Sequence, residues 1–261
     1  MSPPRFFLNS PLETGTCIPL PDAVAHYALR VLRLAHDSPV TLFNGLGGEY
    51  EARLEVQGRQ AQAHIGIHHP REAELAGELC LIQGLAGGDK MDWIVEKAVE
   101  LGATRLVPIF ARRSLLQLRA EHMNKRLQKR LAHWQRIAQS ASEQCGRNRI
   151  MTIEVPGSLE GYLGADPVRP GTLSLLCHPA AEQCLDQALA RWPEGRNTTH
   201  DRPVLRLLIG PEGGWSAEEQ ALALGAGVQA VRFGPRVLRT ETAGLALMAA
   251  CTALLGWNGP A

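Results

Sequence analysis

Two glycine-bearing segments hold the residues best suited to chemistry. The first, Gly210-Pro211-Glu212-Gly213-Gly214, follows the apolar run 205–209 and precedes Ser216, which with Glu219 forms a capping box that marks the start of a helix. Glycines let a ligand approach the backbone and offer it N–H groups, and α/β folds place ligands at turns of this kind, where parallel strands end. We therefore predict a ligand site here rather than a simple tight turn.

The second segment, residues 233–243, has the sequence FGPRVLRTETA. It carries Arg236, Arg239 and Glu241 between apolar stretches. A loop with one charge is usually only solvated surface. Here the uncharged residues after Thr242 predict a buried helix, which anchors the loop in the core and favours a role in the site.

Other classes of site find less support in the sequence. Neither segment is a G-x-G-x-x-G fingerprint, and the stretch Gly84–Lys90 resembles a phosphate-binding loop but lacks the Gly-Lys-Ser/Thr ending. The six cysteines form no C-x-x-C pair, so we expect no metal site and no disulfide scaffold, but free thiols in a reducing cytoplasm. They are Cys17, Cys80, Cys145, Cys177, Cys184 and Cys251.

The elements that must position these residues divide the 261-residue chain into two parts. Residues 1–72 are predicted to form a small β-rich barrel domain, with a helix over 22–34 and strands at 40–43, 50–56 and 61–67. Residues 73–261 alternate strands with helices, which predicts an α/β domain with a parallel sheet and helices on both faces. Its predicted strands are 79–85, 105–110, 150–155, 172–177, 204–209 and 228–233, and its predicted helices are 90–101, 125–145, 181–190, 216–224 and a C-terminal helix from 241.

Charge is nearly balanced overall, with 27 Lys and Arg against 26 Asp and Glu, so no global field directs the chain to nucleic acid or to a membrane. Between Arg112 and Arg149, however, ten basic residues face two acidic ones, a local net charge of +8. A charged helix face is usually only solvated, but a block this unbalanced predicts contact with a polyanion. The helix predicted over 22–34 adds a basic face made of His26, Arg30 and Arg33.

The C-terminal helix bears on location and assembly. Its uncharged stretch, 243–257, is shorter than the ~20 residues that span a bilayer, and no signal-peptide segment opens the chain, so we expect a cytoplasmic protein without a membrane partner. Because this helix is apolar around most of its circumference, we expect a second subunit to cover its outer side, with Leu247 and Met248 in the contact. The alternative is that the helix over 90–101 covers it within one subunit.

Together these motifs resemble the RsmE family of 16S rRNA uridine-N3-methyltransferases. The resemblance rests on both glycine segments, on SEQCGRNR at 142–149, on DKMD at 89–92 with EKAVELG at 96–102, and on RFF at 5–7 with His26 and VLRL at 31–34. It implies a PUA-like RNA-binding domain followed by a SPOUT methyltransferase domain with a C-terminal trefoil knot. It also implies S-adenosylmethionine as cofactor, a homodimer, and N3 of a uridine in 16S rRNA of the small ribosomal subunit (m3U1498) as the target.

Carried over by position, the resemblance implies a set of cofactor residues, whereas the RNA-binding residues follow from local charge and the catalytic candidates from the chemistry of the reaction. The cofactor set is Cys177, His178, Ile209, Gly210, Glu212, Gly213, Gly214, Phe233, Gly234, Pro235, Leu238, Arg239, Thr240 and Ala243. The RNA-binding set is Arg5, His26, Arg30, Arg33, Arg126, Arg130, Arg147 and Arg149. In the reaction, some group must take the N3 proton or stabilise the resulting anion. The candidates are Glu241 and Glu212 as bases, and Arg236 and Arg239 as stabilising cations or phosphate contacts.

The residues themselves leave other functions open. A non-catalytic RNA-binding module would use the same basic surface without binding S-adenosylmethionine. A small-molecule α/β enzyme would carry the basic helix only as a solvated face, and RNA retention that falls with rising salt would count against it. Methyl transfer to a different RNA site is a further alternative.

Overall fold

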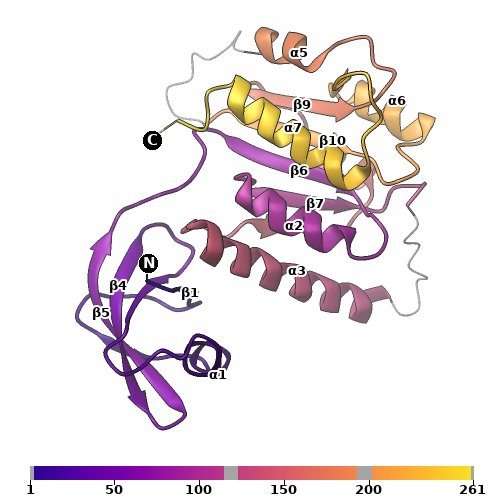
Figure 1. The fold of residues 1–261 in the computed structure, drawn as a ribbon. Helices are drawn as coiled ribbons and strands as arrows, with labels where there is room; N and C mark the ends of the chain where they lie inside the picture. The colour runs from indigo at the N-terminus through magenta and orange to yellow at the C-terminus, as the bar shows by residue number, and fades with distance from the viewer. Residues whose placement is uncertain (1–2, 115–122, 193–201, 260–261) are drawn as a thin grey trace. The chain divides into compact units, whose positions relative to one another are not determined.

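The computed structural model describes residues 3–114, 123–192 and 202–259 (Figure 1). By their internal contacts the residues form two compact units, one of Met1–Glu74 with Gln139–Ile150 and one of Leu75–Ala138 with Met151–Ala261. The N-terminal unit is thus built from two separate stretches of chain. Arg119 of the basic block and most of the polar segment 193–203, which its composition predicts to be a loop, lie outside the described residues.

The N-terminal unit contains a five-stranded sheet in the order β1-β3-β4-β5-β2, in which β1 pairs with β3 in parallel and the other neighbours are antiparallel. Phe6, Leu42 and Leu54 are among its buried core residues, because successive side chains of a strand point to opposite faces. The strands are β1 Arg5–Phe7, β2 Cys17–Pro19, β3 Pro39–Phe43, β4 Glu49–Gln57 and β5 Gln60–His69. The last three confirm predicted strands, whereas β1 and β2 are too short to show a period in the sequence.

The helix predicted over 22–34 is shorter than expected. An α-helix, α1, covers Asp22–His26 and continues as a π-helix, η1, over Tyr27–Val31. Arg33 follows with a φ of 56°, and Leu34 packs against the core. The expectation of one helical face is therefore wrong, because Arg33 lies beyond the helix. The three basic side chains are nonetheless all exposed, namely His26, Arg30 and Arg33.

A network of charged side chains ties the second stretch of this unit to the first. The side chain of Arg147 is 3% exposed and donates to both carboxylate oxygens of Glu74, at 2.9 and 2.6 Å. Arg5 donates to Glu49, and to Oδ1 of Asn148 at 2.5 Å. A buried charge needs such a partner. The sequence assigns Arg5 and Arg147 to RNA contacts, but the structure engages both guanidinium groups inside the protein.

The C-terminal unit is an α/β domain whose six-stranded sheet, β11-β9-β10-β6-β7-β8, is parallel throughout, as predicted (Figure 1). In the part of the chain that the structure describes, no helix has the length and apolar character to cross a membrane. The strands are β6 Glu78–Gly84, β7 Arg105–Ile109, β8 Thr152–Ile153, β9 Thr172–Cys177, β10 Val204–Ile209 and β11 Gln229–Val231. The helices are α2 Lys90–Glu100, α3 Met123–Cys145, α4 Leu159–Ala165, α5 Leu185–Arg191, α6 Ala217–Gly225 and α7 Thr240–Leu254. The end of α3, from Gln139 on, belongs to the N-terminal unit.

Helices cover both faces of this sheet, and the alternation along β6 shows which face each helix covers. Cys80 and Ile82 belong to a buried cluster that includes residues of α4 and α6. Leu81, between them, lies on the other face toward α7, where a Cβ added to Gly244 would stand 3.3 Å from its Cδ1. Glycine at 244 therefore lets α7 lie close to the sheet. The helix α4, seven residues long, has no counterpart among the predicted elements.

Replacing Arg147 with Met should lower the free energy of unfolding by about 3–5 kcal/mol, because the Glu74 carboxylate would stay buried without its partner. Arg149→Met is the matched control. Arg149 also pairs with a glutamate, Glu72 at 3.0 Å, but its side chain is 49% exposed, so we expect a loss of about 0–1 kcal/mol. Urea denaturation followed by circular dichroism measures both values. Equal losses would contradict the structural role of Arg147.

Candidate functional site

A cavity of about 590 Å³ lies within the C-terminal unit, beyond the carboxyl ends of β9, β10 and β11. Its walls are the two glycine segments and residues 177–179. All the residues that the sequence assigns to the cofactor line it except Pro235. Its volume is in the range of small-molecule sites. The four residues assigned to the reaction line it as well, namely Glu212, Arg236, Arg239 and Glu241.

Close packing explains the glycines of the first segment. A Cβ on Gly210 would stand 3.0 Å from Cα of Gly214 and from the nitrogen of Trp215, so a larger residue would crowd the backbone of the turn. Gly214 has a φ of +67°, in the left-handed region that favours glycine. The predicted capping box is confirmed: the Glu219 N–H donates to Oγ of Ser216 at 3.2 Å, and the Ser216 N–H donates to the Glu219 carboxylate at 2.8 Å.

A buried threonine joins the two glycine segments. The hydroxyl of Thr240 donates to the carbonyl of Gly210 at 2.6 Å and accepts a hydrogen bond from Nε2 of Gln83 at 2.9 Å. Gln83, near the end of β6, is fully buried. Because hydrogen bonds are stronger where water is excluded, this pair holds the start of α7 against the glycine turn.

Two groups near the start of α2 bind the carboxylate of Glu212, and we call this arrangement of Glu212, Gly87 and Lys90 the clamp. Oε1 of Glu212 accepts from the N–H of Gly87 at 3.0 Å and from Nζ of Lys90 at 2.9 Å. The loop that precedes α2 begins at Gly84, where an added Cβ would stand 2.5 Å from Cδ of Pro211. The stretch Gly84–Lys90, which resembles a phosphate-binding loop in sequence, therefore binds a carboxylate of its own chain.

The contacts of the clamp determine the protonation states of Glu212 and Lys90. Burial raises the pKa of Glu212, but the hydrogen bonds from Lys90 and Gly87 and the charge of Lys90 outweigh it, so the pKa lies below the usual 4.5. The hydrogen bond to Glu212 raises the pKa of Lys90 above its usual 10.5. Both groups are therefore charged at neutral pH, and Glu212 is a poor proton acceptor.

Glu241, in the first turn of α7, is placed differently. Its Oε2 is buried, accepts no hydrogen bond from any described residue, and lies 3.6 Å from Nζ of Lys90. Its Oε1 lies 4.0 Å from Nη1 of Arg239, whose side chain is 82% exposed. Arg236, also on the cavity wall, is exposed too. One carboxylate with an oxygen that accepts no hydrogen bond from the described residues and two exposed guanidinium groups thus meet at one cavity.

Two lining residues with charged side chains, Lys90 and Arg113, are missing from the predicted set. Lys90 belongs to the DKMD motif, and its position between a glycine-rich loop and a helix is the signal that points to it. Arg113 donates to the carbonyl of Gly213 at 3.3 Å, and a Cβ on that glycine would stand 2.8 Å from Cβ of Arg113. The start of the basic block therefore reaches the cavity wall, a contact across 100 residues that no local pattern reveals.

Other basic residues predicted to bind RNA lie on α3. Arg126 is exposed and Arg130 is half-buried there. The apolar stripe predicted for this helix is confirmed at Trp134 and Ala138, which are buried. Lys125, Lys129 and Arg136 are exposed on the same helix, so its basic side chains remain accessible to a polyanion.

Family comparisons cover most of the chain. The RNA methyltransferase domain family matches residues 73–252, and the RNA methyltransferase PUA domain family matches residues 20–65. Ribosomal RNA small subunit methyltransferase E of Synechocystis is 31% identical over 91% of this chain and 73% of its own length. The protein of the same name from Buchnera aphidicola (subspecies Schizaphis graminum) is 29% identical over 96% of this chain and 95% of its own.

Two solved structures are similar over nearly the whole chain. Ribosomal RNA small subunit methyltransferase E from Neisseria gonorrhoeae, bound to S-adenosyl methionine, has a TM-score of 0.83 at 34% identity and covers 97% of this chain and 98% of its own. A methyltransferase from Legionella pneumophila, with the cofactor SAM bound, has a TM-score of 0.82 at 28% identity and covers 98% of each chain.

Replacing Lys90 with Met should raise the pKa of Glu212, because it removes a hydrogen bond and a charge that lower it. A carboxyl whose folded pKa is depressed stabilises the fold above its unfolded pKa and loses that contribution as the pH falls through the folded value. The variant should therefore be less stable at neutral pH and lose less stability on acidification. Carboxyl carbon-13 NMR titration and urea denaturation between neutral pH and pH about 3 measure both effects.

Lys97→Met is the matched control for this prediction. Lys97 lies on the same helix and pairs with Glu96 and Glu100, both at 2.7 Å, away from the clamp. The Lys97→Met variant should therefore leave the pKa of Glu212 unchanged. If Lys90→Met also leaves that pKa unchanged, the clamp does not determine the charge of Glu212.

Proposed function

Because this chain belongs to the family of the ribosomal RNA small subunit methyltransferases E, we propose that it transfers the methyl group of S-adenosylmethionine to N3 of a uridine in 16S rRNA. The observation that carries this proposal is one cavity at which a glycine-rich turn, a carboxylate with an oxygen that lacks a hydrogen bond, and exposed arginines meet. The identity of the uridine, m3U1498, rests on the family resemblance.

The residues around the cavity fit S-adenosylmethionine. A Cβ added to Gly214 or Gly234 would meet no atom within 4 Å, so both glycines leave open space where an adenosine can approach the backbone. Apolar side chains of Ile209 and Leu238 line the same cavity. Relatives from Neisseria and Legionella hold this cofactor in their structures. When bound, S-adenosylmethionine supplies a methyl group that its sulfonium charge has already activated.

We assign the N3 proton of the uridine to Glu241. Uridine N3–H is a weak acid, so a base must accept its proton as the nitrogen becomes nucleophilic. Glu212 is held by Lys90 and Gly87, whereas Oε2 of Glu241 accepts no hydrogen bond from any residue that the structure describes.

We propose that the exposed guanidinium groups of Arg236 and Arg239 stabilise the negative charge that develops in the reaction. Deprotonation at N3 spreads charge over the neighbouring carbonyl oxygens of the base, and a preorganised cation beside them lowers the barrier. Arg239 also lies 4.0 Å from Glu241, so the base and a stabilising cation stand together at the start of α7.

Glu241→Gln should slow methyl transfer by about 10²–10⁴-fold and leave S-adenosylmethionine affinity unchanged, because the amide keeps the shape of the side chain but cannot take the proton. Mass spectrometry of digested 16S rRNA, offered free and in small subunits, counts the 3-methyluridine formed, and calorimetry measures cofactor affinity.

The outcomes of this experiment are separable. If the parent protein binds no S-adenosylmethionine and forms no 3-methyluridine, the proposed function is wrong and the RNA-binding module is favoured. If the parent is active and Glu241→Gln keeps its full rate, only the choice of base is wrong. Glu212→Gln, slowed more than Glu241→Gln at unchanged cofactor affinity, would transfer the role to Glu212.

RNA binding is proposed to use exposed basic residues of both units. The match of residues 20–65 to the PUA domain family of RNA methyltransferases supports a contribution of the N-terminal unit. The half-buried Arg5 and the buried Arg147 are left out, because carboxylates of this chain engage them. The proposed contacts are His26, Arg30, Arg33, Arg126, Arg130 and Arg149.

The double variants Arg30→Ala/Arg33→Ala and Arg126→Ala/Arg130→Ala should each weaken RNA binding and spare cofactor binding. Each lost phosphate contact should flatten the slope of log affinity against log salt by ~0.7–0.9, because fewer counterions are released. Fluorescence anisotropy across a salt series measures the slope.

The control for RNA binding is Arg169→Ala/Arg191→Ala, which removes two exposed arginines outside the proposed contacts and should leave the slope unchanged. Unchanged affinity and slope in both test variants would exclude these contacts.

We also propose a homodimer in which the outer side of α7 forms the contact. The sequence places Leu247 and Met248 there, but both are fully buried within the single chain, so that assignment is wrong. The residues of α7 that do stay exposed are mainly apolar, namely Thr242, Ala249, Ala253 and Leu254. An apolar side of a helix that faces water is a typical subunit contact.

Ala249→Glu should convert the dimer to monomers, because it places a charge in the centre of that apolar side. Sedimentation velocity at micromolar concentration measures the state, and circular dichroism verifies the fold. Leu222→Glu, at an exposed position of α6, is the control and should leave the dimer intact. A parent protein that sediments as an active monomer would rule the dimer out.

Three further features belong to the proposal. The family matches, which cover residues 20–65 and 73–252, support a domain boundary at residue 72. Resemblance to the family supports a trefoil knot in the C-terminal domain. A ribosomal RNA target supports action in the cytoplasm.

A further inference from the structure

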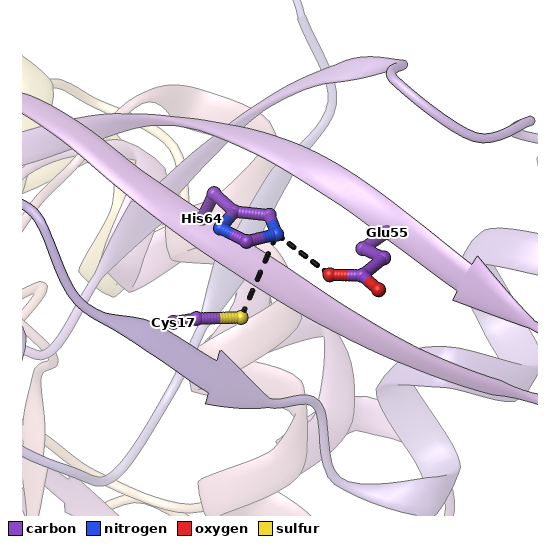
Figure 2. Close-up of side chains that lie close together, drawn as sticks. All are labelled: Cys17, Glu55 and His64. Carbon is purple, nitrogen blue, oxygen red and sulfur yellow. Dashed lines mark hydrogen bonds and ion pairs between the residues drawn. The ribbon is translucent and has the colours of Figure 1, made fainter.

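Three metal-ligating side chains meet on an exposed face of the N-terminal sheet, and none of them belongs to a motif used above. Cys17 on β2 stands directly opposite His64 on β5, and Glu55 comes from the adjoining strand β4. Nε2 of His64 lies 2.7 Å from Oε2 of Glu55 and 3.8 Å from Sγ of Cys17, as Figure 2 shows. One ligand atom from each residue lies within 4.8 Å of the other two.

The geometry distinguishes a metal site from a nucleophile site. In a Cys-His-carboxylate triad, the two ring nitrogens of the histidine serve different partners, one the thiol and one the carboxylate. Here the thiol and the carboxylate both approach Nε2 of His64, so this nitrogen cannot serve as the base of Cys17 while Glu55 engages it (Figure 2). Three donor atoms that all lie within 4.8 Å of one another instead suit a shared cation.

A neighbouring side chain already orients one of the three donors. Nε2 of Gln57 donates to Oε1 of Glu55 at 2.8 Å, which leaves Oε2 toward His64. Hydrogen bonds of this kind hold ligands in position around metals. Oε1 of Gln62 lies 3.2 Å from Sγ of Cys17 and accepts from the thiol, a proton that Cys17 releases when it binds a metal.

We propose that Cys17, Glu55 and His64 bind a zinc ion, with water or Oε1 of Gln62 in the fourth position. Thiolate, imidazole and carboxylate together are the donors that zinc prefers. At zinc bond lengths, tetrahedral ligand atoms stand roughly 3.4–3.6 Å apart. The observed separations of 3.8 and 2.7 Å lie on either side of this range, so small side-chain rotations complete the site.

Zinc at this position would cross-link the edge strand of the sheet to its neighbours. β2 has three residues and pairs with β5 alone, at the end of the strand order. A metal bound to β2, β5 and β4 joins this edge strand to the two strands beside it, and its binding energy adds to the stability of the folded unit.

Cobalt(II) is the probe that tests the proposal, because it occupies zinc sites and its thiolate bond absorbs light. The full chain, stripped with chelator and kept reduced, should bind one Co²⁺ with a near-ultraviolet thiolate charge-transfer band and visible bands of tetrahedral intensity. One equivalent of Zn²⁺ should displace the Co²⁺, abolish the charge-transfer band and the visible bands, and raise the Tm of the protein. Cys17→Ser should abolish the charge-transfer band, and His64→Gln and Glu55→Gln should each weaken affinity at least tenfold.

His69→Gln is the matched control. His69 pairs with Glu51 at 2.8 Å across the same two strands, but no cysteine belongs to the pair, so this variant should bind Co²⁺ as the parent does. A parent without a charge-transfer band, a band that survives in Cys17→Ser, or full affinity in His64→Gln would each overturn the site. These readouts do not depend on methyl transfer, so they test the metal site separately from the proposed function.

Discussion

The carboxylate of Glu212 is the contact on which the arrangement of the candidate site depends. Gly87 binds it from the loop before α2 and Lys90 from the first position of that helix, while Gly84 lies against Pro211 with no room for a side chain. These contacts fix the glycine-rich turn against the end of β6. Since Lys90 also faces Glu241, the same cation sets the electrostatic surroundings of the carboxylate that we assign to the proton. The ion pair of Lys90 with Glu212 is partly exposed and contributes little to stability, so its main effect is to position the glycine-rich turn.

The start of α7 depends on a second contact of the same kind. Thr240 reaches the carbonyl of Gly210 and the amide of Gln83, so the turn, the central strand β6 and the last helix share one hydrogen-bonded junction. Gly244, one turn further on, lies close enough to the sheet that the helix cannot shift outward without losing that packing. The cavity is therefore bounded by rigid elements, which is the condition for positioning a cofactor and a base together.

Arginines serve two separate purposes in this nearly neutral chain. Arg147 and Arg5 are engaged by carboxylates within the N-terminal unit, and in the C-terminal unit Asp166 pairs with both Arg105 and Arg206, each at 2.6 Å. These residues hold stretches of chain together and are poorly available to a polyanion. The basic block is consequently less uniform than its composition indicates, and its accessible charge lies mainly on α3.

Local patterns determined much of this protein from sequence alone. Ser216 and Glu219 predicted their helix start, because a capping box involves neighbouring residues, and the alternation of long strands and helices predicted the parallel sheet. Other features exist only through contacts between distant residues, so no pattern contains them. Arg147 looks like any basic residue until Glu74 is found beside it, Lys90 reaches the cavity only across the clamp, and Cys17, Glu55 and His64 become neighbours only through antiparallel pairing. The tertiary structure decided these because burial and register are properties of the folded chain.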